Sequence, residues 1–486
     1  MPGRSDCCGQ RRWLPALSAP LLLGILVGLR LWQFDNDDPY ITYRYARNLA
    51  TGNSLVYNPG ERVLGTTSPL FALILGGLTL LGRDPAFWGK LVSCLSLGVV
   101  GVLVGRLVGG ASRREHRSLA WLVAGALAVL DPLLITGGFG SETFLHVSLI
   151  FGAFLLLDSP KQVIAGVLLG CAIVCRGDAV VAAAVYLAVW TVRNRRLPVH
   201  AVIGLGTLAG AWGMFAWAYY GTPIPQTLAI KRLQAHVWGS DFLEGIAFYA
   251  MRYFGESRWV MVIAPLAAIG LLRIIRLRLT VCGALVVWAL CYLGAYAILN
   301  VPHVYIWYYS VVSPVLVMLA CLGTADLAGR RRPVGALLAG AGVVTAFVAF
   351  IQCEQAFHRW LPYPRHPVYV EAAQWIEAHS PQEATIAAFE VGAVGYASEH
   401  RIIDLWGLVT PDVGHHTMAL GDGTYALRRF RPDYLIVHRE LWGNERLLLE
   451  APWFDEAYRF EMSFSSPRYS GVDVFRLVDP AAVPGV

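Results

Sequence analysis

Long apolar runs separated by short polar segments fill the first three quarters of the chain. Eleven runs recur, at 13–31, 86–110, 118–136, 142–157, 161–175, 179–192, 199–219, 257–272, 279–299, 304–328 and 334–352. Most approach the roughly 20 residues that a helix needs to cross a bilayer, and three (142–157, 161–175 and 179–192) are shorter. The first run lacks the small-residue cleavage site of a signal peptide, which favours an uncleaved helix. The pattern predicts a polytopic helical membrane protein with about eleven crossings.

Composition agrees with this prediction. Only 15% of the 486 residues are charged and the mean hydropathy is +0.52, whereas a soluble domain carries about a quarter charged residues. The six cysteines at positions 94, 171, 175, 282, 291 and 321 lie in apolar runs, and none follows Cys353. No cysteine or histidine spacing typical of a metal site is present.

Arginine and lysine are distributed unevenly between the predicted loops. With the N-terminus inside, the inner loops hold 16 Lys and Arg in 39 residues, and the outer loops hold 8 in 103 residues. Positive charge marks the cytoplasmic side of a membrane protein. We therefore expect a cytoplasmic N-terminus and an extracytoplasmic C-terminus, and we read the net charge of +6 as membrane anchoring and not as nucleic-acid binding.

One further apolar stretch, "SPLFALILGGLTLLG" (68–82), breaks the charge asymmetry if it counts as a crossing. We predict a re-entrant or interfacial helix inside a long outer loop, 32–85, since such segments occur where protein covers them.

The last 130 or so residues have a different pattern. Strand-length apolar segments occur at 384–390, 401–404, 433–438 and 473–478, with helical patterns such as 369–379 between them. This alternation predicts a small α/β domain. We expect a transmembrane catalytic domain over 1–352 and an extracytoplasmic α/β domain over 353–486.

Acidic residues cluster directly after the first apolar run, in "FDNDDPYITYRYARNLATG" (34–52). Asp38 precedes Pro39 and Gly52 closes the segment, which predicts a short amphipathic helix over 39–51 with Asp38 as its cap. Asp37 has no such local role. A carboxylate shielded from water can be tuned toward a general base.

Two more carboxylates are predicted at outer helix ends. Glu142 lies in "GGFGSETF" (137–144), and Asp178 follows Arg176 in "CRGD" (175–178). Together with Asp37 they could close around one cavity. Each could also be a surface charge, and for Asp178 that interpretation is slightly favoured.

Basic and aromatic residues occur in the remaining outer segments. Lys231 follows the proline-rich turn of "YYGTPIPQTLAIKRL" (219–233), where it could also bind lipid headgroups. The segment "NVPHVYIWYYSVVSP" (300–314) holds His303, Tyr305 and Tyr308. An aromatic belt accounts for most of that cluster without a function, and an isolated histidine is more often structural than catalytic.

These motifs resemble the GT-C superfamily of integral-membrane glycosyltransferases that use polyprenyl-phosphate sugars. "DDPYITYRYARNLATGNSLVYNPGERVLGTTSPL" (37–70) is similar to the opening of the terminal arabinofuranosyltransferases of actinobacterial cell walls. "GSETFLH" (140–146), "GTPIPQTLAIK" (221–231), "WYYSVVSP" (307–314) and "EVGAVGYASEHRIIDLWGLVTP" (390–411) resemble later signatures of the same group, in the expected order.

The resemblance implies a GT-C-like fold and an inverting transferase. Its donor would be a polyprenyl-phosphate sugar, and its acceptor a cell-envelope glycan, lipid or protein. Such donors are generally used without a metal, so no metal or cofactor is expected.

The resemblance also assigns roles to the candidate residues. Asp37 matches the family's base, with Asp38 and Glu142 as further catalytic candidates. The cations expected to hold the donor phosphate are Lys231, Arg44 and Arg176. The candidates for the acceptor or the cavity wall are Asp178, His303, Tyr305 and Tyr308.

Two other classes of protein remain open. A lipid-linked sugar transporter or flippase would need ionisable residues near the bilayer midplane, and here the acids gather at one surface. A non-catalytic scaffold on the same fold would not need to retain Asp37, Glu142 and Lys231.

Overall fold

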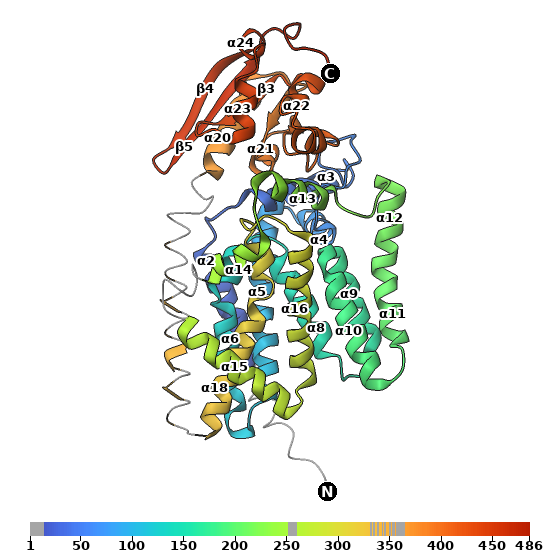
Figure 1. The fold of residues 1–486 in the computed structure, drawn as a ribbon, viewed down its shortest axis with the longest axis vertical. Coiled ribbons are helices and arrows are strands. Elements are labelled where there is room, and N and C mark those ends of the chain that lie inside the picture. Colours follow the sequence, from blue (N-terminus) through green and yellow to red (C-terminus); the bar gives the residue numbers. More distant parts are fainter. Residues whose placement is uncertain are drawn as a thin grey trace. The chain divides into compact units, whose positions relative to one another are not determined.

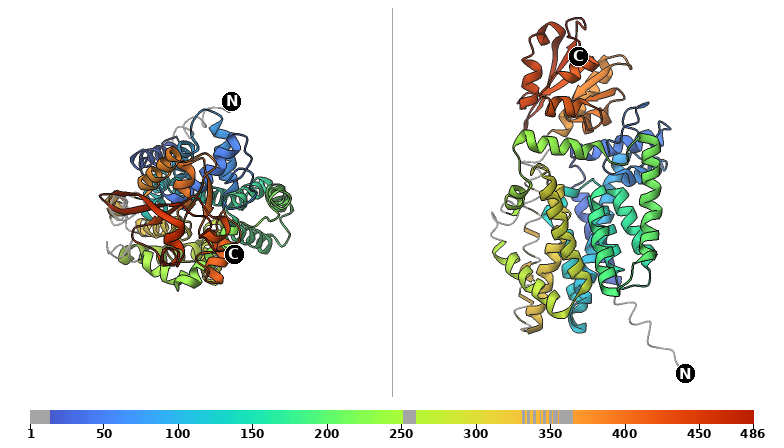
Figure 2. Two further views of the ribbon diagram at one scale, coloured as in Figure 1. Left: turned by 90° about the horizontal axis from the view of Figure 1, so that it is seen from above. Right: turned by 45° about the vertical axis from the view of Figure 1, so that its right-hand side comes forward.

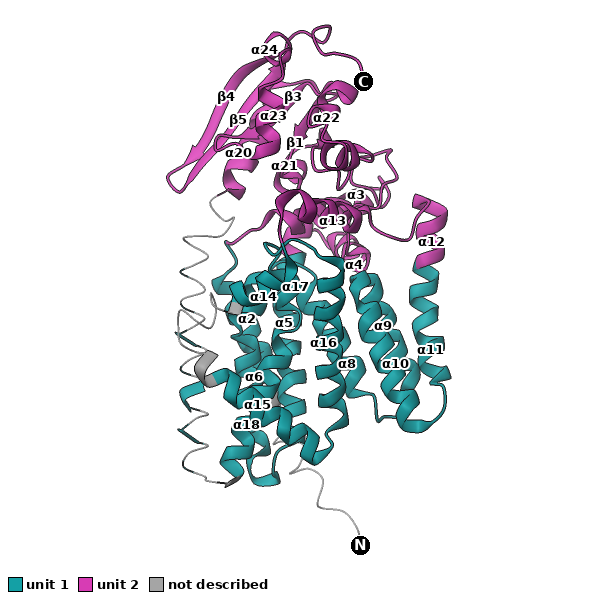
Figure 3. Ribbon diagram, viewed as in Figure 1, with its two compact units in different colours: residues 1–33, 89–212, 241–355 teal, residues 34–88, 213–240, 356–486 magenta. Residues whose placement is uncertain are grey.

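The computed structural model describes residues 14–250, 260–330 and 365–486, together with scattered positions between 331 and 364. The chain divides into two compact units (Figure 3). Unit 1 comprises residues 1–33, 89–212 and 241–355, and unit 2 comprises residues 34–88, 213–240 and 356–486. Unit 2 therefore contains most of the predicted outer loop 32–85, part of the second long outer loop, and the C-terminal residues. The predicted boundary between 352 and 353 falls outside the described residues.

Helices build unit 1 (Figure 1). In chain order they are α2 (Leu14–Arg30), α5 (Pro85–Gly110), α6 (Arg117–Val129), α7 (Pro132–Gly138), α8 (Thr143–Leu155), α9 (Gln162–Cys175), α10 (Val180–Asn194), α11 (Val199–Leu205), α12 (Ala211–Tyr220), α14 (Phe242–Ala250), α15 (Val260–Leu277), α16 (Thr280–Leu299), α17 (Trp307–Ser310) and α18 (Ser313–Arg330). Of α12, only Ala211 and Trp212 belong to unit 1, and the rest of this helix belongs to unit 2.

Within the described residues, four segments are long and apolar enough to cross a membrane: Pro85–Gly110, Val199–Tyr220, Thr280–Leu299 and Trp307–Gly329. The bent pair Arg114–Val129 and Pro132–Gly138 makes a fifth if it forms one span, and shorter apolar helices include Thr143–Leu155 and Gln162–Cys175. The helical membrane character predicted from the sequence is confirmed, and the count of eleven crossings stays a prediction. Much of the predicted run 334–352 lies outside the described residues.

The long helices of unit 1 run side by side (Figure 2) and approach closely where their residues are small. A Cβ on Gly270 of α15 would lie 2.0 Å from the Leu319 carbonyl oxygen of α18, so a larger residue does not fit there. At the arginine-rich end of this pair, Arg273 lies 3.3 Å from Asp326 and donates to the Ala111 carbonyl at 2.7 Å. These contacts join the ends of α5, α15 and α18.

Unit 2 contains three helices from the predicted outer loops: α3 (Asp37–Ala50), α4 (Pro69–Thr79) and α13 (Gln226–Trp238). Helix α3 begins two residues before its predicted start and ends one residue before its predicted end. With 11 residues, α4 is shorter than a helix that spans a bilayer, in agreement with the predicted interfacial segment.

The C-terminal part of unit 2 is an α/β fold, as predicted. Its elements are α20 (His366–His379), β1 (Thr385–Ala388), α21 (Val391–Ala397), β2 (Arg401–Asp404), α22 (Tyr425–Phe430), β3 (Tyr434–His438), α23 (Gly443–Leu449), α24 (Phe454–Ala457), β4 (Tyr458–Ser466) and β5 (Tyr469–Leu477). The strand order is β2-β1-β3-β5-β4; β1 runs parallel to β2 and β3, and β5 runs antiparallel to β3 and β4. Strand β4 was not predicted.

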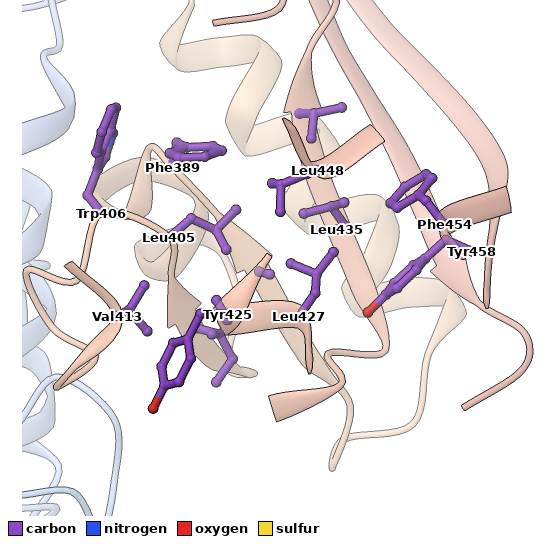
Figure 4. Packing of buried hydrophobic residues seen from close by; sticks show 14 of the residues in the cluster. Phe389, Leu405, Trp406, Val413, Tyr425, Leu427, Leu435, Leu448, Phe454 and Tyr458 are labelled. Carbon is purple, nitrogen blue, oxygen red and sulfur yellow. The ribbon is translucent and has the colours of Figure 1, made fainter. Parts of the chain in front are cut away.

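The core of this fold includes a residue from α13. Leu405, Leu435 and Phe454 pack in the core (Figure 4), and Ile230 of α13 belongs to the same buried cluster. The chain neighbour of Ile230 is Lys231, so core packing fixes the position of this lysine.

Candidate active site

Asp37 is the first residue of α3, and its carboxylate is bound by the start of α21. Its Oδ2 accepts a hydrogen bond from the Gly392 N–H at 2.8 Å, and its Oδ1 accepts one from the Ala393 N–H at 2.6 Å. A Cβ on Gly392 would lie 1.9 Å from the Asp37 carbonyl oxygen, so glycine permits this approach. Asp37 was predicted to have no local partner, and its side-chain partners indeed lie more than 350 positions away along the chain.

The helix cap is also different from the prediction. Asn36 is the N-cap of α3, and its side chain accepts a hydrogen bond from the Asp37 N–H at 2.9 Å. Asp38 and Pro39 therefore lie in the first turn. Proline is tolerated there because the first N–H groups of a helix have no intrahelical acceptor. The assignment of Asp38 as the cap is wrong, and its side chain is available for another role.

Glu390 directly precedes α21, whose first N–H groups bind Asp37, and the two carboxyl groups interact electrostatically. Burial raises the pKa of Asp37 to about 7, although its backbone hydrogen bonds oppose this change. Burial, together with the Asp37 and Asp38 carboxylates, raises the pKa of Glu390 well above its ordinary value. Sequence reasoning missed Glu390, although it opens the signature 390–411.

Lys231 lies beside Asp38. Its Nζ is 3.9 Å from Asp38 Oδ2, and the side chains of Lys231 and Asp38 are 8% and 45% exposed, respectively. Helix α13 is held by the Gln226 side chain, which donates to the Gly407 carbonyl at 3.0 Å. A buried, fixed ammonium is unlike a lysine that extends into lipid headgroups, and this favours the phosphate role over the headgroup interpretation.

Arg44, predicted to hold the donor phosphate, is used by the protein itself. It is buried and donates to the carbonyls of Tyr57, Gly395 and His400 and to the Asn58 side chain. These contacts join α3 to the α/β fold, so the structure gives Arg44 a structural role in place of the predicted phosphate contact.

A buried hydrogen-bonded chain lies within the α/β fold. Glu445 accepts from His438 Nδ1 at 2.6 Å, His438 Nε2 lies 2.6 Å from the Tyr369 hydroxyl, and this hydroxyl lies 3.2 Å from that of Tyr469. Both tyrosines interact electrostatically with Glu390. The chain was not predicted, because its members come from α20, β3, α23 and β5.

Unit 1 holds a second carboxylate cluster. Arg176 Nη2 lies 2.7 Å from Asp178, and Arg176 Nη1 lies 3.4 Å from Glu142. The side chain of Asp178 is only 10% exposed, so its interpretation as a surface charge is wrong. Glu142 and Asp178, two of the three carboxylates expected to close around one cavity, meet at Arg176. The cavity shared with Asp37 stays a prediction, and the contact of both carboxylates with Arg176 was not predicted.

Three unpredicted residues complete this cluster. The hydroxyls of Tyr292 and Tyr296 donate to Asp178 Oδ2 at 3.2 and 2.9 Å, and His146 Nε2 lies 3.2 Å from Asp178 Oδ1. The tyrosines are four residues apart on α16, and this spacing was a usable signal because it places both on one helix face.

The three ring-bearing candidates, Tyr308, Tyr305 and His303, lie in different surroundings. Tyr308 is buried, with its ring 5.7 Å from the Arg176 guanidinium and 4.4 Å from the Tyr296 ring. The Tyr305 ring lies 4.9 Å from the Trp307 ring and is tilted against it by 34°. His303 lies 5.9 Å from the Phe248 ring, so the structure associates Tyr308 with the charged cluster and gives His303 an aromatic neighbour instead.

Among residues 14–250, 260–330, 365–486 and the scattered positions described between them, no group of three or more His, Cys, Asp and Glu side chains could hold a metal ion.

Comparison with known proteins gives one curated relative of direct interest. The terminal β-(1→2)-arabinofuranosyltransferase of Mycobacterium tuberculosis is 27% identical over 253 residues, covering 48% of this chain and 40% of the relative. The chain thus matches less than half the length of this relative. A domain of unknown function, DUF8728, matches residues 355–480.

Two solved proteins resemble the whole chain in structure. The Archaeoglobus fulgidus oligosaccharyltransferase AglB, in complex with an inhibitory peptide and a dolichol-phosphate, has a TM-score of 0.57 at 13% identity, covering 98% of this chain and 75% of AglB. ArnT from Cupriavidus metallidurans bound to undecaprenyl phosphate has a TM-score of 0.52 at 13% identity, covering 98% and 99%. The chain therefore has the GT-C fold of these membrane proteins and resembles the terminal arabinofuranosyltransferases in sequence.

Proposed function

We propose that this protein is an inverting membrane glycosyltransferase that moves a sugar from a polyprenyl-phosphate donor to a cell-envelope glycan, lipid or protein. The observation that carries the proposal is the placement of Asp38, the chain neighbour of Asp37, next to the buried Lys231 within unit 2. A base and a phosphate-binding cation are the two groups that such a transfer requires from the protein.

The donor class follows from the relatives. AglB and ArnT were solved with dolichol-phosphate and undecaprenyl phosphate, and the curated relative transfers arabinofuranose. We therefore favour a pentofuranose on a polyprenyl monophosphate. The apolar helix α4, in the same unit as Lys231, suits the lipid end of such a donor.

In the proposed reaction Asp37 is the base. It removes the proton of an acceptor hydroxyl, and the oxygen bonds to the anomeric carbon. The bond from that carbon to the phosphate oxygen breaks, polyprenyl phosphate leaves with the electron pair, and configuration inverts. The Lys231 ammonium offsets the charge that grows on the leaving phosphate.

The environment of Asp37 supports this role. A base works best when its pKa lies near the working pH, and that of Asp37 is raised to about 7. The N–H groups of Gly392 and Ala393 orient the carboxylate. A carboxylate has about four acceptor positions, so both oxygens can still accept a substrate hydroxyl.

The buried cluster of unit 1 receives a different role. Arg176 is balanced by Glu142 and Asp178, so it offers a phosphate less positive charge than Lys231 does. We assign Glu142, Asp178 and Tyr308 to ordering the helix ends, with hydroxyl-rich acceptors as their proposed ligands. The orientation with unit 2 on the extracytoplasmic side rests on the arginine and lysine distribution.

Purified protein in vesicles, supplied with a synthetic polyprenyl-phosphate arabinofuranose and an arabinan acceptor, tests the proposal. We expect extended acceptor and free polyprenyl phosphate in equal amounts. Movement of intact donor across the bilayer without release of polyprenyl phosphate would instead show a transporter. Chelation by EDTA is expected to leave transfer unchanged, and loss of transfer restored by a divalent ion would contradict the proposed metal-independent mechanism.

A further inference from the structure

Tyr57 lies in the loop between α3 and α4 of unit 2 and is only 1% exposed. Two side chains of α3 hold its backbone: the Tyr57 carbonyl accepts a hydrogen bond from Arg44 Nε at 2.9 Å and one from Asn48 Nδ2 at 2.8 Å. The Arg44 guanidinium also lies over the Tyr57 ring, 4.5 Å from its centre. Helix α3, which begins with Asp37, therefore fixes both the backbone and the ring of Tyr57.

The hydroxyl of Tyr57 reaches the peptide group that binds the proposed base. It donates to the Val391 carbonyl at 2.5 Å. This oxygen belongs to the same peptide group as the Gly392 N–H, which donates to Asp37 Oδ2 at 2.8 Å. Because a peptide group is planar and rigid, a bond that fixes its oxygen also limits the directions that its N–H can take. Two hydrogen bonds on one peptide group thus connect the Tyr57 hydroxyl to the Asp37 carboxylate.

Two glycines of α21 make room for this connection. A Cβ on Gly392 would lie 1.9 Å from the Asp37 carbonyl oxygen and 2.7 Å from its Oδ2. A Cβ on Gly395 would lie 1.9 Å from the Tyr57 hydroxyl oxygen. A larger residue at position 392 would displace Asp37, and one at position 395 would displace the Tyr57 hydroxyl. Each glycine therefore permits one of the two close approaches.

We propose that Tyr57 is a positioning residue that acts on the base Asp37 through the peptide group of Val391 and Gly392. This inference rests on the proposed function of Asp37. It gives a part in the chemistry to a buried tyrosine that comes from neither α3 nor the α/β fold.

The direction of the effect follows from the hydrogen bonds. A hydrogen bond to a peptide carbonyl polarises the peptide group and strengthens its N–H as a donor. A donor to a carboxylate favours the charged form of that carboxylate, and the Gly392 N–H accordingly lowers the pKa of Asp37 against the larger effect of burial. Removal of the Tyr57 hydroxyl should therefore raise the pKa of Asp37 further, so that less of the base is charged near neutral pH.

Tyr45 offers a matched comparison in the same unit. It is also a buried tyrosine whose hydroxyl donates to a backbone carbonyl, that of Val63, at 2.6 Å. Its oxygen accepts the Gly65 N–H at 2.9 Å as well, so removing this hydroxyl should cost at least as much stability as removing that of Tyr57. The Val63 carbonyl belongs to a different peptide group from the Gly392 N–H that binds Asp37. A purely structural role of the hydroxyl therefore predicts the same outcome for both tyrosines.

Measurement of kcat/KM against pH for the wild-type protein, Tyr57→Phe and Tyr45→Phe tests this inference. Tyr57→Phe should lower kcat/KM near neutral pH by about two- to tenfold, as for loss of one hydrogen bond, with the effect on kcat and the donor KM unchanged. Its acid limb should move to higher pH by up to about one unit. Tyr45→Phe should lose stability but keep the wild-type limb. An unmoved limb in Tyr57→Phe, or the same movement in both variants, would overturn the inference.

Infrared titration of the resting proteins provides a readout without turnover. The carboxylate band that is lost in Asp37→Asn belongs to Asp37. Its midpoint should lie at higher pH in Tyr57→Phe than in the wild-type protein and in Tyr45→Phe. If the midpoint moves in this way but the wild-type protein transfers no sugar, the connection from Tyr57 to Asp37 stands and the proposed function fails. If the wild-type protein transfers sugar and the midpoint does not move, the inference fails and the proposed function stands.

Discussion

The two units gather carboxylates around a cation in different ways. In unit 1, Arg176 pairs with Asp178 at 2.7 Å, and two tyrosine hydroxyls complete the shell of that carboxylate. In unit 2, Lys231 lies 3.9 Å from an Asp38 side chain that is 45% exposed. The first cluster satisfies its charges internally. The second leaves a carboxylate and an ammonium 3.9 Å apart, and we propose that a substrate binds between them.

We interpret the Arg176 cluster of unit 1 as structural and the Asp38–Lys231 pair of unit 2 as part of the proposed catalytic site. A buried ion pair that is fully hydrogen-bonded holds helix ends in place, and removing one member leaves an uncompensated charge. In unit 2, burial raises the pKa of Asp37 to about 7, so this carboxyl can exchange a proton near neutral pH. We therefore expect substitutions in unit 1 to alter stability first and those in unit 2 to alter catalysis first.

The largest expected effect on stability belongs to Arg176→Met. Glu142 and Asp178 would remain buried without their cation, at a cost of about 3–5 kcal/mol. Thermal unfolding in detergent measures this. The control Arg193→Met breaks the exposed pair with Asp158, which is worth at most about 1 kcal/mol. Normal stability with abolished transfer would instead support the predicted contact of Arg176 with the donor phosphate.

Loss of the Lys231 ammonium should lower the turnover number, kcat. Lys231→Met keeps much of the buried stem and should lower kcat by about 10²-fold, as for one lost electrostatic stabiliser. The adjacent Arg232 is exposed, so Arg232→Met is the matched control and should retain activity. If Lys231→Met and Arg232→Met both weaken membrane association to the same extent and both keep normal turnover, Lys231 binds lipid headgroups and not the donor phosphate.

The pH dependence below neutrality is a smaller effect. The folded-state pKa of Asp37 is raised from its ordinary value to about 7, so the base form predominates above that pH. Transfer should fall about tenfold for each pH unit below it. A rate independent of pH from 5 to 7 would exclude a base with this pKa.

The raised pKa of Asp37 also affects stability. Between its ordinary pKa of 3.8 and its folded-state pKa of about 7, the folded protein binds the proton more tightly than the unfolded chain does. The thermal midpoint should therefore decrease as the pH rises through this range.

The sequence predicted the local elements well. The apolar run 86–110 became α5 (Pro85–Gly110), and the alternation after residue 365 became the α/β fold. Strand β4 was missed, although Tyr458, Phe460, Met462 and Phe464 alternate with polar residues. This period of two is the ordinary strand signal.

The site was predicted in its residue types and less well in its contacts. Asp37, Asp38 and Lys231 were named from local patterns, and the structure brings Asp38 and Lys231 together. The error at the cap arose because "DNDDP" offers several capping residues in succession. The hydrogen bonds of Asp37 to Gly392 and of Arg44 to Gly395 join residues that lie more than 340 positions apart. A local sequence pattern cannot predict such contacts.

Single-turnover transfer by Asp37→Asn and Asp38→Asn, with donor affinity and thermal stability measured on the same preparations, tests the central claim most directly. Removal of a general base typically costs 10²–10⁴-fold. Asp37→Asn should therefore be folded and bind donor with near wild-type affinity, yet transfer at least about 10²-fold more slowly, while Asp38→Asn keeps most of the activity. The reverse result would make Asp38 the base, and full activity in both variants would contradict the transferase mechanism.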